Sequence, residues 1–298
     1  MKAKPLRYVL TASLGSWLIF AQDASEPDYQ LALRYTRQAE WKSAEIVLER
    51  LLRNSPGYLP AVLLKSKVLF SLGRYPESLG IARQFLEFEP NSGEGHKLAG
   101  LAYFMAGNQE KARSELEKAS ELSPQDAESF YYLGRVYFTA SNMPRALSAF
   151  ETAIKFDATS VRAHNHLGQT LEGLARFSEA KAAYLTAIKL ESAQKVRSEW
   201  PFHNLGALLL QQGEAEQAAG YFRDALARNP GLVPSKVKLA MALSLSGKLD
   251  EAQTLLEDAL RLEPQSSEAH YQLARLLTKM GRPEEARKHF LTFRQLQP

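Results

Sequence analysis

The stretch FHNLGALLLQQGEAEQAAGYFRDALARNP, residues 202–230, decides how this chain folds. Gly213 stands at its midpoint, where a left-handed residue commonly ends one helix, and Pro230 closes it, where proline stops the next. Gly206 and Ala218 are small and lie twelve residues apart. Two helices of one hairpin approach closely only where their facing side chains are small. The stretch therefore predicts one helix-turn-helix unit.

The unit recurs along the chain with a period of 34 residues. Repeats 1 to 8 begin near positions 25, 59, 93, 127, 161, 199, 233 and 267, and one step of 38 residues interrupts the period. The eighth position of every repeat is small, as is the residue twelve places later, and the eleventh is always Tyr or Leu. Large residues there fill the space that the small ones leave. Most repeats also keep the midpoint glycine and the closing proline.

This spacing of Leu, Gly, Tyr, Ala, Phe, Ala and Pro over residues 25–298 resembles the tetratricopeptide repeat family. The resemblance implies an all-α fold, a right-handed superhelical solenoid of about eight stacked helix-turn-helix units, because one hairpin cannot bury its apolar faces alone. In repeats 4 and 5 the midpoint glycine is replaced by Ser141 and Ala175, and a four-residue insertion follows near 194–198. We expect a changed twist or a longer helix there, or else a neutral insertion in a surface turn.

The resemblance also implies a concave groove, lined by the first helix of each repeat, that binds a peptide or helix of a partner protein. The expected partner-binding residues of this groove are Tyr131, Arg135, Asn165, His166, Gln169, His203, Asn204, Tyr271 and Arg275. Asn and Gln both donate and accept hydrogen bonds, which suits a peptide backbone, and Arg suits a carboxylate. The alternative is that a solvent-lined groove simply carries polar residues. Family members that clamp acidic chaperone termini carry a Lys and Asn set, and here Lys97 is followed by Leu101 instead.

Residues 1–21 have the pattern of an export signal. Lys2, Lys4 and Arg7 precede an apolar run over residues 8–20, and Ala21 stands before polar residues. The run is shorter than the ~20 residues that a spanning helix needs. We therefore expect a cleaved signal peptide and a periplasmic or secreted protein. An uncleaved signal anchor, which would tether the protein to the membrane, and a buried N-terminal helix of the fold are the alternatives.

Charge and composition exclude several function classes. The chain has 37 basic and 33 acidic residues, but three basic residues lie within 1–21, so the remainder carries 34 against 33, a net charge of +1. The absence of cysteine excludes disulfides and thiolate-bound metals. None of the six histidines has the i, i+4 spacing of a helical zinc site, and no phosphate loop or nucleophile motif is present. We expect no enzyme activity, no cofactor and no metal.

The function predicted from these observations is that of a monomeric, non-catalytic scaffold for protein–protein interaction, in the assembly of an envelope or secretion complex. One alternative is a non-catalytic subunit or accessory factor of an enzyme complex. A weaker one is a nucleic-acid binder, which needs a basic groove with base-stacking residues. Acidic groove residues such as Glu94, Glu172 and Glu268 argue against a nucleic-acid partner.

Overall fold

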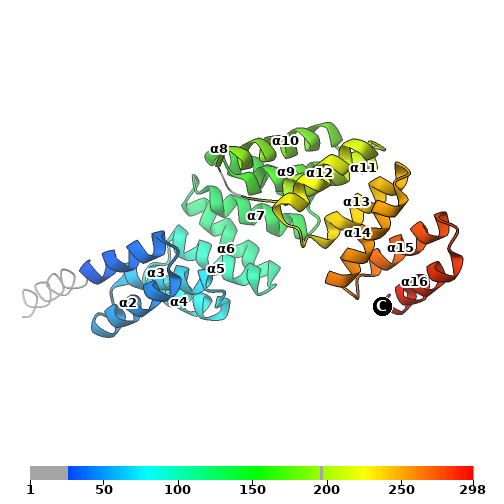
Figure 1. The fold of residues 1–298 in the computed structure, drawn as a ribbon. Helices are drawn as coiled ribbons and strands as arrows, with labels where there is room; N and C mark the ends of the chain where they lie inside the picture. The colour runs from blue at the N-terminus through cyan, green and yellow to red at the C-terminus, as the bar shows by residue number, and fades with distance from the viewer. Residues whose placement is uncertain (1–25, 195–196, 298) are drawn as a thin grey trace, which may run out of the picture. The chain divides into compact units, whose positions relative to one another are not determined.

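The computed structural model describes residues 26–194 and 197–297 of the chain. Over these residues the chain forms α-helices joined by short turns, with no strand (Figure 1). A helix over residues 26–37 comes first. The helices that follow are α2 (Trp41–Asn54), α3 (Leu59–Ser71), α4 (Tyr75–Phe88), α5 (Gly93–Met105), α6 (Gln109–Leu122), α7 (Ala127–Thr139), α8 (Met143–Phe156), α9 (Val161–Gly173), α10 (Phe177–Gln194), α11 (Trp200–Gln211), α12 (Ala215–Arg228), α13 (Val233–Leu245), α14 (Leu249–Leu262), α15 (Ser267–Lys279) and α16 (Pro283–Gln295).

The predicted export signal, residues 1–21, lies outside the described residues. Within the described ranges, no helix combines the length and the apolar character that crossing a membrane requires. The odd-numbered helices α3 to α15 are the first helices of repeats 2 to 8, and the even-numbered helices are the second helices. All of these first helices begin at the predicted start of their repeat, except α11, which begins one residue after the predicted start at 199.

Small residues set the distance between the two helices of a repeat. A Cβ atom added to Gly168 of α9 would lie 2.4 Å from Cε1 of Tyr184, and one added to Gly206 of α11 would lie 2.9 Å from Cε1 of Phe222. Both aromatic rings are fully buried, and a close-packed interior leaves them little room to move. The glycines are therefore required by the close approach of the helices, as the size pattern predicts.

The turns between the two helices of a repeat share one left-handed residue. Midpoint glycines such as Gly73 and Gly213 have φ of +77° and +83°. Ser141 and Ala175, which replace the glycine in repeats 4 and 5, both have φ of +57°. The turn geometry is thus retained, although a residue with a Cβ adopts it at a cost of about 1 kcal/mol.

The insertion lengthens a helix, which confirms one of the two expectations for this region. Helix α10 has 18 residues, whereas α8 and α12 have 14 each. Near its end, Glu191 is only 4% exposed and accepts hydrogen bonds from Nε and Nη2 of Arg228, at 2.9 and 3.1 Å. The same guanidinium lies 3.6 Å from the ring centroid of Phe202. Burial alone would raise the pKa of Glu191, but Arg228 lowers it, so the pair ties together α10, α11 and α12.

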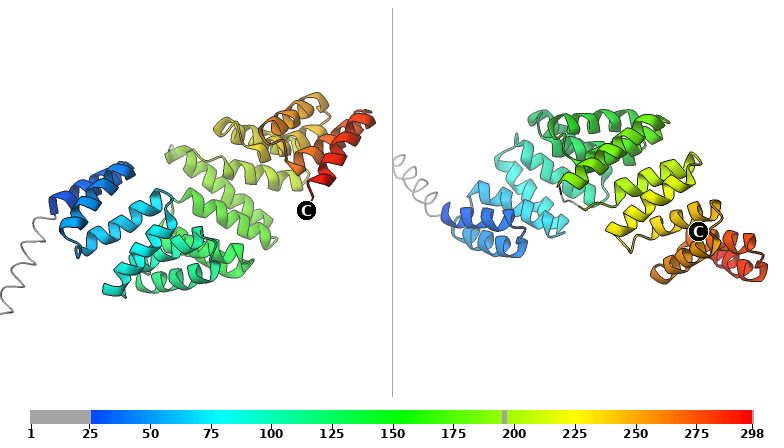
Figure 2. Two further views of the ribbon diagram at one scale, coloured as in Figure 1. Left: turned by 90° about the horizontal axis from the view of Figure 1, so that it is seen from below. Right: turned by 45° about the horizontal axis from the view of Figure 1, so that its top comes forward.

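The chain divides into two compact units, one ending at Asn142 and the other beginning at Met143. Within each unit, consecutive helices pack against one another, and each first helix also contacts the first helix of the next repeat. Among the described residues no two second helices are in such contact. The first helices therefore line the inner side of each unit, which we call its inner face. Figure 2 shows the successive helix pairs from two directions. The all-α class and the stacking of helix-turn-helix units are thus confirmed.

Candidate functional site

The structure divides the predicted groove residues between the inner faces of the two units. Tyr131 and Arg135 lie on α7 in the N-terminal unit. The residues on α9, α11 and α15 of the C-terminal unit are Asn165, His166, Gln169, His203, Asn204, Tyr271 and Arg275. We describe the two parts of the site separately.

Two asparagines of adjacent first helices bind each other in the C-terminal unit. Nδ2 of Asn204 donates to Oδ1 of Asn165 at 2.9 Å, and the two residues are 8% and 6% exposed. This bond leaves Oδ1 of Asn204 as an acceptor and the amide NH₂ of Asn165 as a donor. Among the described residues no side-chain polar atom is both fully buried and unbonded, so these two groups reach solvent. The pair is less exposed than the sequence analysis assumed for residues that line a groove.

His203 of α11 is held in a mostly apolar setting. Its Nδ1 lies 2.8 Å from Oγ of Ser235, and its ring packs 5.7 Å from Trp200 and 5.8 Å from Phe222, measured between centroids. Burial, assisted by the charge of Lys238, lowers the pKa of His203 to about 4. A serine beside a neutral histidine has the nucleophile and the general base of a catalytic site. Ser235, however, has no exposed surface. A substrate therefore cannot reach its hydroxyl.

His166 and Gln169 occupy the inner face of α9. Nδ1 of His166 lies 2.9 Å from the backbone oxygen of Arg162, and its ring is 5.6 Å from that of Phe150. Gln169 is half-buried. Within residues 26–194 and 197–297, no cluster of three or more His, Asp or Glu side chains is placed to hold a metal ion. His166 thus packs against α8 of the preceding repeat, and His203 contacts α13 of the next one.

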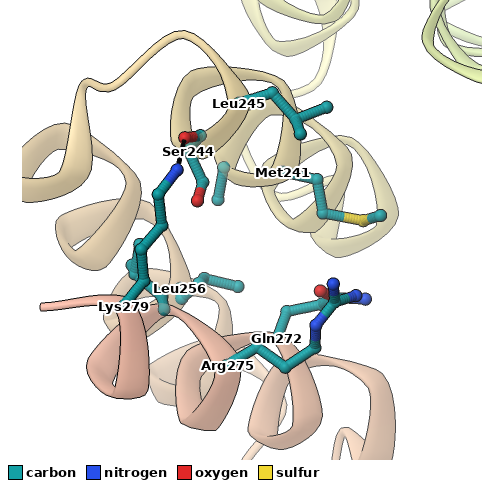
Figure 3. A pocket seen from close by; sticks show the side chains of 9 residues that line it. Met241, Ser244, Leu245, Leu256, Gln272, Arg275 and Lys279 are labelled. Carbon is teal, nitrogen blue, oxygen red and sulfur yellow. Dashed lines mark hydrogen bonds between the residues drawn. The ribbon is translucent and has the colours of Figure 1, made fainter. Parts of the chain in front are cut away.

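A pocket of about 260 Å³ opens between α13 and α15, the first helices of repeats 7 and 8 (Figure 3). Its lining residues are Ala240, Met241, Ser244, Leu245, Leu256, Gln272, Arg275, Leu276 and Lys279. Ala240, Leu256 and Leu276 are buried and form its floor, while Leu245 at the rim is 67% exposed. Nζ of Lys279 donates to the backbone oxygen of Ser244. The pocket therefore joins an apolar floor to a polar, cationic edge.

Of the predicted site residues, only Arg275 lies in this pocket. Tyr271, four residues before it, instead packs its ring against Phe293 and Phe290 of α16, at 5.0 and 6.2 Å between centroids. Leu245 and Lys279 were missed as named site residues. Both lie on the first helix of their repeats, which the family resemblance already places along the groove, so the signal was present in the spacing.

In the N-terminal unit, Arg135 of α7 lies over a cluster of aromatic rings. Its guanidinium carbon is 4.6 Å from the ring centroid of Phe104 on α5, 5.6 Å from that of Tyr132 and 5.9 Å from that of Tyr131. Arginine over the face of an aromatic ring is stabilised by the charge distribution of the ring. Tyr131 is buried, so it supports Arg135 more than it offers a surface of its own.

Lys97 of α5 is enclosed by carboxylates. Its Nζ lies 2.6 Å from Glu94, 3.3 Å from Asp126 and 3.5 Å from Glu128. Burial favours the neutral amine, but the three carboxylates outweigh it and raise the pKa of Lys97. This lysine is buried, and its charge is balanced within the fold.

Models of one repeat family match three parts of the chain. The model described as "Tetratricopeptide repeat" matches residues 209–260 and 243–293, and a second model with this description matches 161–194. A model described as "TPR repeat" matches residues 100–141. No curated protein sequence matches the chain significantly.

Several solved structures have a similar fold. The Cut9–Hcn1 hetero-tetramer of the APC/C aligns with a TM-score of 0.69 and 17% identity over 87% of this chain, which spans 50% of that neighbour's length. PilF of Pseudomonas aeruginosa aligns with a TM-score of 0.62 and 25% identity, covering 69% of this chain and 92% of its own. PilW, a type IV pilus biogenesis factor, aligns with a TM-score of 0.61 and 18% identity over 66% and 90% of the two chains. At 17% and 18% identity the likeness shows the fold alone.

Proposed function

Because the chain belongs to the tetratricopeptide repeat family, whose repeats generally serve as non-catalytic scaffolds, we propose that it holds a segment of a partner protein against its inner face. The Asn165–Asn204 pair carries this proposal. Its remaining donor and acceptor belong to two residues that bond to each other on neighbouring first helices. One residue of an extended peptide presents an N–H and a C=O that complement them. The nine residues predicted from the sequence are the proposed contacts, two on the inner face of the N-terminal unit and seven on that of the C-terminal unit, and Arg135 and Arg275 are the cations among them.

The test removes both asparagines together. In Asn165→Ala/Asn204→Ala no buried partner is left unbonded, so the fold is expected to persist. Two lost hydrogen bonds correspond to a partner affinity that falls by roughly ten- to a hundredfold. A photo-crosslinking amino acid placed at Gln169 of the inner face reports binding in the native cell envelope, because it captures only what lies against that face.

Two controls accompany this measurement. The crosslinker at Gln217, an exposed residue of α12, tests the second-helix side, and Gln217→Ala/Gln265→Ala removes two exposed amides elsewhere. We expect adducts from position 169 only, and their loss in the asparagine variant alone. Equal adducts from both positions, or adducts that survive in the asparagine variant, would contradict the proposal.

We further propose that the protein is exported and acts in the assembly of an envelope or secretion complex. The basic and apolar pattern of residues 1–21 supports export. N-terminal sequencing of the protein from fractionated cells tests this. A mature chain that begins after Ala21 in the exported fraction is expected, whereas one that still begins at Met1 contradicts cleavage and favours the signal anchor.

A further inference from the structure

The pocket between α13 and α15 narrows the kind of segment that the scaffold binds. We propose that it takes a short peptide segment in which a large apolar side chain is flanked by a carboxylate. The inference rests on the proposed function and deepens it, since it gives the chemistry of the partner at one place on the inner face. It is carried by two properties of the pocket, its apolar volume and its cations without carboxylate partners.

The apolar part of the pocket has room for one large side chain. A cavity of about 150 Å³ lined by apolar side chains is enough to bind benzene, and this pocket measures about 260 Å³. Its floor is apolar and close-packed, because Ala240, Leu256 and Leu276 are each at most 3% exposed. Leu245 presents two thirds of its surface to water at the rim, so an apolar side chain that enters would cover it.

The polar edge of the pocket carries positive charge that the fold does not neutralise. None of the lining residues is acidic, and neither Arg275 nor Lys279 forms an ion pair with any described residue. Elsewhere on this inner face Lys238 is paired with Glu268 at 3.0 Å. The two cations of the pocket therefore differ from their neighbour in lacking a counter-charge, and a carboxylate of the bound segment would supply it.

The two cations stand on the same edge of the pocket. Arg275 and Lys279 are four residues apart on α15, which places them on one side of the helix. In Figure 3 Arg275 and Gln272 face Met241 across the opening, while Lys279 reaches the backbone of Ser244 at the far end. Arginine binds a carboxylate through two parallel hydrogen bonds, and Lys279 keeps two further donors. An apolar side chain on the floor thus brings an adjacent carboxylate to this edge.

The experiment detects binding in the pocket by the NMR signal of the methyl group of Met241, which lines it. The chain has five methionines, so ¹³C-methyl labelling gives few signals, and Met105 and Met143 serve as references far along the chain. The probe is a capped peptide of sequence Gly-Glu-Leu-Phe-Glu-Gly. Two matched probes replace both Glu by Gln, or Leu and Phe by Ala. We expect the first probe to shift the Met241 signal and each matched probe to bind at least about tenfold more weakly.

Variants of the protein distinguish the contribution of the two cations to binding from that of the rest of the pocket. In Arg275→Gln/Lys279→Gln the Glu and Gln probes should bind equally. In the control Arg287→Gln/Lys288→Gln, which removes the same charge from the exposed side of α16, the preference should persist. Met241 shifts that are equal for all three probes, a preference that survives in the pocket variant, or no shift with any probe would each overturn the inference. The proposed function is judged separately, by crosslinking from Gln169 in repeat 5, so either proposal can fail alone.

Discussion

At the scale of single residues, the glycines of α9 and α11 show how much depends on the absence of one methyl group. Gly168 faces Tyr184, whose ring is fully buried and whose hydroxyl donates to Glu172. The ring is therefore fixed at both ends. A glycine that lies in the middle of a helix without such a neighbour, such as Gly220 on the exposed side of α12, carries only the entropic cost of its flexibility.

These two glycines should respond in opposite directions to the same substitution. Gly168→Ala is expected to lower the free energy of unfolding by roughly 1–3 kcal/mol, because the new Cβ overlaps the ring of Tyr184. Gly220→Ala should raise it by about 0.5–1 kcal/mol. Urea unfolding followed by Trp200 fluorescence measures both. A neutral Gly168→Ala variant would show that the two helices can move apart freely.

His203 makes the stability of the C-terminal unit depend on pH. Its pKa is about 4 in the folded protein and about 6.5 for an ordinary histidine, so between these values the unfolded chain binds the proton more tightly. Stability is therefore full above pH 6.5 and falls as the pH drops toward 4. At about 1.4 kcal/mol per pH unit, the loss is on the order of 3 kcal/mol.

The comparison variant for this prediction is His203→Gln, which keeps a hydrogen-bonding group beside Ser235 but does not titrate. We expect the difference in unfolding free energy between pH 7 and pH 5 to be smaller in the variant by about 2 kcal/mol. Trp200, whose ring packs against His203, reports the transition. The same pH dependence in both proteins would mean that His203 is protonated freely in the fold.

The spacing in the sequence predicts which residues share the inner face, but not how deeply they are buried. Asn165 and Asn204 fall at groove positions and are nevertheless almost enclosed, because they bond to each other across two repeats. The ring of Tyr271 packs against an aromatic residue of α16 and does not line the pocket. Such outcomes depend on the side chains of neighbouring repeats, which a pattern within one repeat does not describe.

At the scale of helices, the long α10 shows how an insertion is accommodated. The extra residues continue the helix, and Glu191 near its end is buried against Arg228 of α12. A buried carboxylate without its cation is strongly destabilising. The ion pair therefore matters more for the alignment of these helices than for a net gain in stability.

A double-mutant comparison tests this role of the ion pair. Arg228→Met leaves the buried Glu191 without its cation and should cost about 3 kcal/mol or more. Glu191→Leu/Arg228→Met replaces the pair by apolar side chains and should lie within about 1 kcal/mol of the native protein, with the Met sulfur on the ring of Phe202. Chemical denaturation gives both values. If the double variant is as unstable as the single one, the two side chains are not coupled.

The helices themselves follow closely from the sequence, because glycine, proline and small residues act locally. Even the turns at Ser141 and Ala175, where the glycine is missing, keep the left-handed conformation. A longer helix was one of the predicted outcomes of the insertion. The pattern did not predict that Glu191 near its end pairs with Arg228, thirty-seven residues later.

At the scale of the whole molecule, contacts remain local along the chain. Each described helix packs only against helices one or two places away. Stability in such proteins is approximately a sum over repeats and their nearest-neighbour interfaces. A substitution is therefore expected to change mainly the unfolding free energy of the unit in which it lies.

Two tryptophans allow this locality to be measured. Trp41 lies in α2 of the N-terminal unit and Trp200 in α11 of the C-terminal unit. With Trp17 replaced by Phe, variants that keep only one of the two report each unit separately. Gly206→Ala, which places a Cβ against Phe222, should lower the urea midpoint seen by Trp200 by about 1 M and that seen by Trp41 by much less. Equal shifts would indicate one cooperative transition.

The pocket between α13 and α15 has one further consequence, for how this chain evolves. Leu245, Arg275 and Lys279 stand at positions that the repeat pattern leaves free, whereas the small residues and turn glycines that stack the helices lie elsewhere in each repeat. Mutations at the pocket edge can therefore accumulate without loss of the fold. Descendants of one ancestral chain can keep the same architecture and exchange partners, so a shared fold between two such chains says little about a shared ligand.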